Sequence, residues 1–134
     1  MGLKKKYNRG MVKSEDIMNG EVRIHQNHRI FVVDYTGLDS NEITQTMRHN
    51  TKITLTAKEP NSLVLMIMKA PKVDKQVLRT SIKLAPQMKP YTKKIAVVGL
   101  PTIVQTFVNY IVTIAKVNAR VFGDESEAMD WLTE

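Results

Sequence analysis

The chain contains no cysteine. It therefore has no disulfide framework, no thiolate nucleophile and no cysteine-ligated metal, and its composition suits a reducing compartment. No apolar run approaches the roughly 20 residues that a membrane-spanning helix needs. The first residues, MGLKKKY, lack the apolar segment of a signal peptide, and Lys6 stands where a myristoylation motif requires Ser or Thr. We therefore expect a cytoplasmic protein without a transmembrane segment.

Glycine-framed catalytic and phosphate-binding motifs are also missing. Gly99-Leu-Pro101 lacks the glycine repetition and the Lys-Ser/Thr ending of a P-loop, so we interpret it as a turn with Pro101 at the first position of a helix. No serine lies in a nucleophile elbow. Asp34 and Tyr35 could place an acid and a phenol in a cleft, but the following Thr36-Gly37 favours a chain reversal. We predict that the protein is not an enzyme; an uncharacterised hydrolase-type activity is the alternative.

Histidines offer no metal site either. His25 and His28 flank the tip of a predicted hairpin, where cross-strand pairing could bring two imidazoles together. A catalytic zinc ion uses three protein ligands, and neither histidine has a carboxylate nearby in the sequence. His49 lies on a predicted helix and is interpreted as a surface or boundary residue. We therefore predict no metal and no cofactor.

Hydrophobic periodicity divides the chain into alternating strands and helices. Short apolar runs rich in β-branched residues predict strands, and apolar residues that recur with a helical period predict helices. The predicted strands cover 21–24, 29–34, 62–68, 94–98 and 120–122, and the predicted helices cover 39–57, 74–88, 102–116 and a terminal segment from Asp124. Gln26-Asn27 would form the tip of an initial hairpin. The element order is therefore β-β-α-β-α-β-α-β-α.

This order predicts an α/β fold with a mixed, mostly parallel sheet of four or five strands flanked by four helices, joined by right-handed crossovers. Two D-x-x-E sequences, at 39–42 and 124–127, resemble capping boxes at helix starts. The predicted inward-facing helix residues are Ile43, Met47, Ile53, Val77, Leu78, Ser81, Leu84, Ala85, Met88, Ala128, Trp131 and Leu132. Residues 1–13 are expected to be a basic disordered tail, and residues 14–134 a single domain.

Charge is unevenly distributed along the chain, whose formal net charge is +7 at pH 7. Residues 69–94 contain eight bases and one acid, whereas the last twelve residues contain five acids and no base. On the 74–88 helix, Lys75, Arg79 and Lys83 follow one another at i, i+4 and i+8, so they share a face. With Lys72 they form a basic stripe that we expect to bind an acidic protein partner or an anionic ligand. No aromatic residue that looks exposed lies between these bases, which argues against nucleic acid as the partner.

The chain resembles the SpoIIAA-like branch of the STAS (STAS/SEC14-like) domain family, a group of small bacterial proteins. Three stretches carry the resemblance, at 30–38, 89–99 and 119–132. The resemblance implies a role in binding proteins or small apolar ligands. In the wider STAS group, anti-sigma-factor antagonists carry a phosphorylated serine at the start of the helix after the central strand. Here that junction contains no Ser or Thr, and Asp74 near this position is interpreted as a helix N-cap.

Two functional hypotheses follow. The first is a non-enzymatic regulatory or interaction module that binds an acidic protein through the basic stripe of Lys72, Lys75, Arg79 and Lys83. The second is a carrier or sensor of a small apolar, lipid-like ligand, motivated by eight methionines that include Met66 and Met68 on the predicted central strand. Methionine side chains adapt well to apolar cavities. The apolar face of the 102–116 helix either packs wholly on the sheet or joins a homodimer at its edge near Val112.

Overall fold

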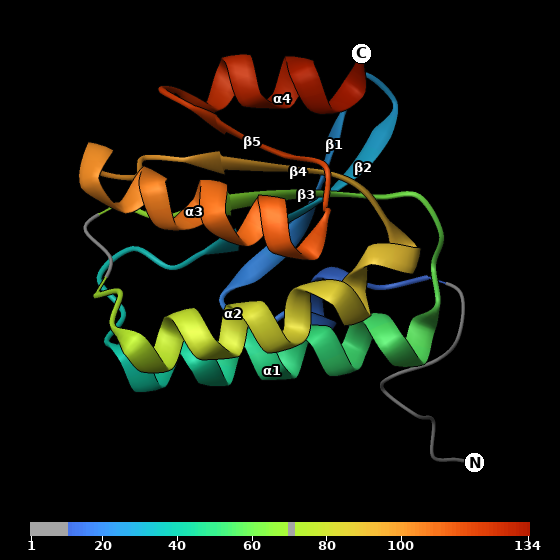
Figure 1. The fold of residues 1–134 in the computed structure, drawn as a ribbon. Coiled ribbons are helices and arrows are strands. Elements are labelled where there is room, and N and C mark those ends of the chain that lie inside the picture. The colour runs from blue at the N-terminus through green and yellow to red at the C-terminus, as the bar shows by residue number, and fades with distance from the viewer. Residues whose placement is uncertain (1–10, 70–71) are drawn as a thin grey trace.

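The computed structural model describes residues 11–69 and 72–134 of the 134-residue chain. Its strands are β1 (Gly20–His25), β2 (His28–Asp34), β3 (Ser62–Ile67), β4 (Thr92–Val98) and β5 (Ala119–Phe122). Its α-helices are α1 (Ser40–Ala57), α2 (Lys75–Met88), α3 (Thr102–Ala115) and α4 (Glu125–Thr133), with short 3-10 helices at Ser14–Asp16 and Lys89–Tyr91. The predicted element order is confirmed (Figure 1).

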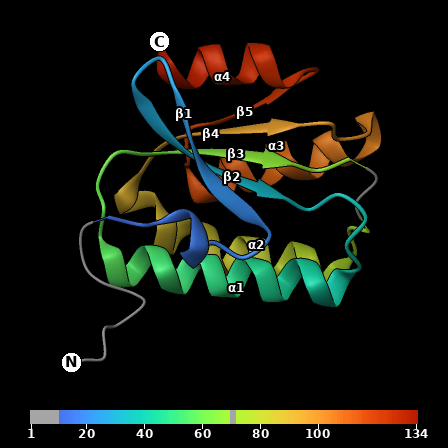
Figure 2. The same cartoon turned by 180° about the vertical axis from the view of Figure 1, so that it is seen from behind.

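The five strands lie side by side in chain order, from β1 to β5. β1 and β2 form an antiparallel hairpin, whose tip residues Gln26 and Asn27 have φ angles of 49° and 65°, as a tight primed turn requires. The pairs β2–β3, β3–β4 and β4–β5 are parallel. Because each parallel step moves in the same direction, right-handed crossovers place α1, α2 and α3 on one face of the sheet. α4 lies alone on the other face (Figures 1 and 2).

Aspartates begin three of the helices, as the sequence predicts for two of them from the D-x-x-E pattern and for Asp74 from its place after the central strand. The side chains of Asp39, Asp74 and Asp124 accept hydrogen bonds from the backbone N–H groups of the residues three positions later, at 2.8, 3.0 and 2.9 Å. Asp39 and Glu42 cap each other reciprocally. Pro101 is the N-cap of α3 rather than its first helical residue, one position from the expectation.

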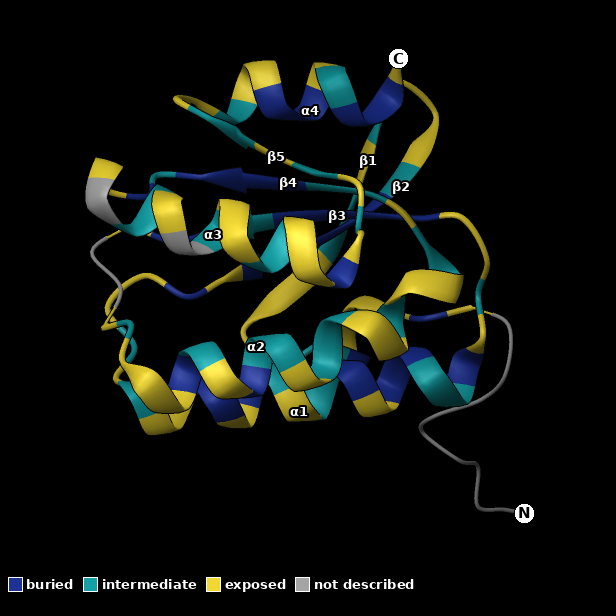
Figure 3. Ribbon diagram, viewed as in Figure 1, coloured by how far each residue is buried: buried dark blue, intermediate teal, exposed yellow. Residues whose placement is uncertain are grey.

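Alternating strand residues build a separate core on each face of the sheet. Toward α4, buried residues of β2, β3 and β4 such as Ile30, Leu65 and Val98 pack against Ala128 and Leu132. Toward α1–α3, the core comprises two further clusters, one around Ile43 and Val97 and one around Ile53 and Phe31. Figure 3 shows buried strands in the middle of the molecule and mixed burial along α2 and α3.

The packed domain begins earlier than the predicted boundary at Ser14. Val12 is 3% exposed and packs with Phe31 and Ile53. Its N–H donates to Glu59 Oε1 at 2.8 Å, and its carbonyl accepts from Arg29 Nη2. Arg29 in turn pairs with Glu59 at 3.1 Å, so β2 and the α1–β3 loop jointly hold this segment. The rest of the predicted tail, residues 1–10, lies outside the described residues.

Candidate ligand-binding cavity

A cavity of about 170 Å³ lies between the sheet and the three crossover helices. Its floor comes from the sheet face that carries Val33, Val64, Met66 and Val97, and its walls come from α1, α2 and α3. Nearly all of the described lining is apolar, as in a site for an apolar molecule. The cavity thus lies between the sheet and the layer of three helices, not between the sheet and α4.

Burial shows where the cavity opens. The floor residues Val33 and Val97 are 5% and 3% exposed. In contrast, the lining residues of α2 from Leu78 to Met88, and the described lining residues of α3, are half-buried. The open side therefore lies between α2 and α3, which cover the same face of the sheet (Figure 1).

Short side chains contribute to the space between α2 and α3. The described lining includes Ser81 and Ala85 from α2 and valines at 104, 108 and 112 from α3, beside the longer Leu78, Leu84, Met88 and Ile111. Helices pack about 8–10 Å apart, and small side chains at such a spacing fill less of the volume between them. The predicted inward face of α2 is therefore correct in direction, but of its six predicted residues only Val77 is fully buried, at 3% exposure.

Methionines are concentrated around the cavity. The structure places the two predicted ligand-cavity residues, Met66 and Met68, in its lining, together with Met47 from α1 and Met88 from the end of α2. These are four of the eight methionines in the chain. Their unbranched, polarisable side chains adapt to apolar ligands of different shapes.

Sequence reasoning missed the contribution of α3. The apolar face of this helix was expected to pack wholly on the sheet or to join a homodimer near Val112. Val104 and Val108 pack against the core cluster that contains Val97, as the first alternative predicts in part, and together with Val112 they also line the cavity. A homodimer at Val112 stays a prediction. The sequence feature that could have indicated this cavity is the series of short β-branched residues on α3, together with the small residues on α2.

Few polar groups reach the cavity, and no charged side chain belongs to its described lining. Asn50, Ser81 and Thr92 line it, but the side chain of each is hydrogen-bonded to the protein backbone, at 2.9 Å in each case. Tyr35, by contrast, is 2% exposed, and burial raises the pKa of its phenol, so the hydroxyl stays protonated at neutral pH. The polar groups in the described lining are therefore all neutral.

The basic stripe of Lys72, Lys75, Arg79 and Lys83 lies on the outer side of the cavity wall formed by α2 and of the segment before it. All four residues are exposed, and none of them forms an ion pair within residues 11–69 and 72–134. The acidic α4 lies on the opposite face of the sheet (Figure 1). The basic stripe and the acidic C-terminal segment of the sequence therefore lie on opposite sides of the sheet.

Lys94 does not belong to this basic region, although the sequence grouped it there. On β4, Lys94 pairs in register with Leu63 and faces α4. Its Nζ donates to the Trp131 carbonyl at 2.7 Å and lies 4.9 Å from the centroid of the Trp131 ring. The cation thereby caps the C-terminal end of α4, where carbonyl groups have no partner within the helix.

Asp74 joins the starts of α1 and α2. Its Oδ2 accepts a hydrogen bond from the Ser40 hydroxyl at 2.7 Å, and its Oδ1 accepts from the Val77 N–H at 3.0 Å. The Ser40 hydrogen bond, followed by that of Val77, holds the pKa of Asp74 below its ordinary value. Its role as N-cap is confirmed.

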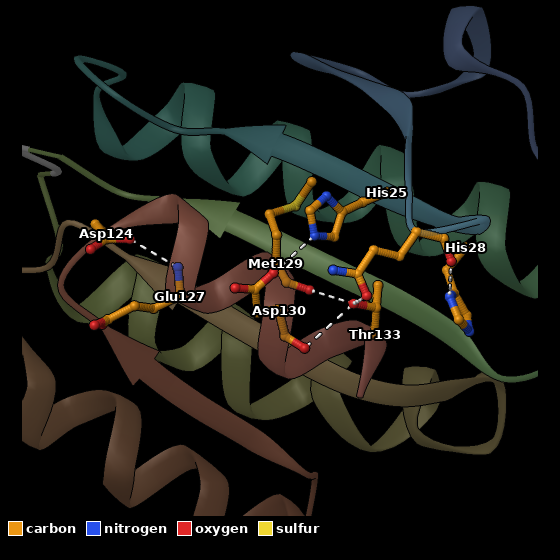
Figure 4. Close-up of polar contacts among 8 residues, drawn as sticks. His25, His28, Asp124, Glu127, Met129, Asp130 and Thr133 are labelled. Atoms are coloured by element: carbon orange, nitrogen blue, oxygen red, sulfur yellow. Dashed lines mark hydrogen bonds and ion pairs between the residues drawn. The ribbon is translucent and has the colours of Figure 1, made fainter.

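The histidines are engaged separately. His25 lies 3.1 Å from Asp130 of α4, whereas His28 Nδ1 lies 2.9 Å from the Gln26 carbonyl, so the two rings point to different partners (Figure 4). His49 contacts the Asp16 carbonyl at 3.0 Å. No group of three or more His, Asp or Glu residues within the described ranges could hold a metal ion. Asp34 is exposed and closes a turn with the Thr36 N–H, as the chain-reversal interpretation predicts.

No protein-family model and no curated protein matches the chain. Among solved structures, the chain is similar to an uncharacterised protein of the DUF3478 family with a SpoIIAA-like fold from Shewanella loihica PV-4. The two are 15% identical in sequence, the match covers 84% of this chain and 91% of that one, and the TM-score is 0.66. The chain therefore has the SpoIIAA-like α/β fold that its sequence resembles; at this identity the likeness establishes the fold alone.

Within the described residues, no helix is both long and apolar enough to span a bilayer.

Proposed function

We propose that this protein is a non-enzymatic binding module that holds a small apolar ligand in the cavity between the sheet and α1–α3. The observation that carries the proposal is the 170 Å³ apolar cavity lined by Met47, Met66, Met68 and Met88. An apolar cavity of comparable size, about 150 Å³, binds benzene. The proposal includes a cytoplasmic location. The ligand would then be made inside the cell or would enter it by crossing a membrane.

Methionine methyl NMR gives a direct test. With 13C-methyl methionine, added toluene is expected to shift the signals of the four cavity methionines. Met129 belongs to the packed core against α4 and is 7% exposed, so its signal is an internal control that should stay in place. Uniform shifts of all methionines, or no shift at saturating toluene, would contradict the proposal. Native mass spectrometry of protein purified without denaturation then identifies a ligand retained from the cell.

A cavity-filling variant sharpens the test. Ala85 lines the cavity from α2, whereas Gln87 is exposed two residues later on the same helix. Ala85→Leu is expected to abolish the toluene-induced shifts, and Gln87→Leu adds a leucine to the same helix without occupying the cavity. Retention of binding in Ala85→Leu would place the toluene elsewhere.

The basic stripe supports a second candidate function, the docking of an acidic protein partner. Four exposed cations without ion pairs in the described chain form a strongly positive surface that attracts anionic partners. Lys75→Glu with Arg79→Glu is expected to abolish binding of a labelled poly-glutamate peptide, measured by fluorescence anisotropy. Lys52→Glu with Lys93→Glu changes the net charge equally at two exposed positions outside the stripe. Equal losses in both double variants would mean that only net charge matters.

A further inference from the structure

Tyr35 has an unusual position for a tyrosine. It follows β2 directly and is 2% exposed. Its backbone groups are both used, because its N–H donates to the Ile67 carbonyl at 2.7 Å and its carbonyl accepts from the Leu38 N–H at 3.2 Å. Its side chain packs with Val33, Met68 and Leu100 and lines the cavity.

The hydroxyl of Tyr35 has no hydrogen-bond partner among the described residues. Every fully enclosed side-chain nitrogen or oxygen in this part of the chain does have a partner. The hydroxyl is therefore not fully enclosed, and Tyr35 is one of the residues that line the cavity. Buried tyrosine hydroxyls usually find a partner, because an unpaired buried polar group is costly.

Most of the other polar side chains that line the cavity already have hydrogen-bond partners, which leaves few groups that could bind a polar ligand atom. Asn50, Ser81 and Thr92 already bond the backbone, as described above. Thr51 is the second lining residue whose hydroxyl has no partner in the described chain. It lies eleven residues along α1 from Ser40, and α1 begins close to the end of β2 and runs back beside the sheet (Figure 1). Thr51 therefore lies about three turns from the start of α1.

The size and charge of the cavity restrict the ligand further. A space of about 170 Å³ accommodates a molecule of one aromatic ring or a short branched chain. A carboxylate or an ammonium group would be buried without a counter-ion, because the described lining contains no charged side chain. The neutral phenol can donate a hydrogen bond to an oxygen or accept one from a hydroxyl.

We propose that the cavity selects a small, uncharged molecule with one polar oxygen, which hydrogen-bonds the Tyr35 hydroxyl while its apolar part packs against the methionines. This inference rests on the proposed apolar-ligand function and adds the size, charge and polarity of the ligand. Tyr35 acts as the specificity-determining residue, and Thr51 does not.

Two ligands of nearly the same shape test the hydrogen bond. Acetophenone carries a carbonyl where α-methylstyrene carries a methylene group, so the ratio of their affinities measures recognition of the oxygen. In Tyr35→Phe this ratio is expected to fall about 3- to 10-fold relative to the wild type, the range for one hydrogen bond. Thr51→Val removes the other free hydroxyl and is expected to leave the ratio unchanged. Titrations monitored by methionine methyl NMR give both affinities.

The outcomes separate the inference from the proposed function. Failure of the wild type to bind either probe would overturn both. Binding of both probes with an unchanged ratio in Tyr35→Phe would overturn the inference alone, as would a fall in the ratio in Thr51→Val instead. The wild type offers a readout that needs no variant: the 13Cζ signal of Tyr35 should move with acetophenone and not with α-methylstyrene, and equal movement would contradict the hydrogen bond.

Discussion

The two faces of the sheet are covered very differently. One face is covered by α4 alone, a helix of nine residues, and yet the residues between them form a closed core in which Ala128 and Leu132 are 0% and 2% exposed. The other face is covered by three helices, and it contains the cavity. The number of covering helices therefore does not decide how completely a sheet face is packed.

Side-chain size and anchoring account for the difference. α4 brings Met129 and Leu132 onto the sheet, and the partly buried rings of Trp131 and Phe122, with centroids 5.5 Å apart, close its side. Lys94, the Arg23–Glu125 ion pair and the hydrogen bond between His25 and Asp130 hold its position. The described cavity lining from α2 and α3 includes short side chains, namely Ser81, Ala85 and three valines, beside larger ones such as Leu84 and Ile111. The face toward α4 is closely packed, whereas the face toward α1–α3 leaves a cavity.

The largest expected effect contrasts one leucine from each face. Leu132→Ala opens a hole in the closed core and is expected to cost about 2–5 kcal/mol of unfolding free energy. Leu84→Ala removes a half-buried side chain that already borders the cavity, so we expect a loss of about 1 kcal/mol. Urea denaturation at neutral pH measures both. Equal losses would show that the two faces are packed alike.

Adding volume should have opposite effects on the two faces. Ala128→Leu overpacks a fully buried site and is expected to destabilise the protein by about 1–3 kcal/mol. Ala85→Leu fills existing space and is expected to stabilise it by about 0.5–2 kcal/mol. Thermal and urea denaturation report the sign in each case. Destabilisation by Ala85→Leu would mean that the cavity cannot accept an extra side chain.

The two ion pairs formed by Arg29 of β2 and Arg23 of β1 should differ in how much each stabilises the fold, and the expected effects are smaller than those above. Glu59 is 19% exposed, pairs with Arg29 and accepts the Val12 N–H, whereas Glu125 is 39% exposed and pairs only with Arg23 within the described residues. Glu59→Gln is expected to cost about 1–2 kcal/mol, because a half-buried charge-assisted network is broken. Glu125→Gln is expected to cost less than about 0.5 kcal/mol. Raised salt should weaken the second pair more than the first.

The smallest effect concerns Asp74, at the entrance to α2. Its pKa is lowered in the folded state, chiefly by the Ser40 hydroxyl, so the folded protein binds fewer protons than the unfolded chain. The resulting stabilisation is present above the ordinary pKa of an aspartate and is lost as the pH falls through the lowered value. Asp74→Asn keeps an N-cap but removes the charge. Its stability deficit should therefore be visible at pH 7 and shrink below about pH 4.

A hydroxyl deletion provides the control for Asp74. Ser40→Ala removes the first contribution to the lowered pKa and leaves the Val77 N–H in place. We expect a weaker dependence of stability on pH than in the wild type, measured by urea denaturation at several pH values. If the pH dependence of stability is unchanged in both variants, Asp74 does not contribute to it.

Local chemistry in the sequence determined the element order, the three aspartate caps and the mostly parallel sheet. Apolar periods and capping residues act over a few positions, so their consequences are visible without a structure. α1 shows both sides of this rule. Its several threonines lower helix propensity, yet Asp39–Glu42 marks its start, and the structure buries Thr44, Thr46, Thr51 and Thr54 against its neighbours.

Tertiary structure alone decided the candidate site. Whether Ala85 meets a neighbour or empty space depends on the distance to α3, and whether the Tyr35 hydroxyl has a partner depends on residues far away in the chain. Lys94 shows the same principle, because a lysine in a basic segment proved to cap α4 across the sheet. Side-chain types and their periods are local properties, whereas a cavity is the volume that remains after distant elements have packed.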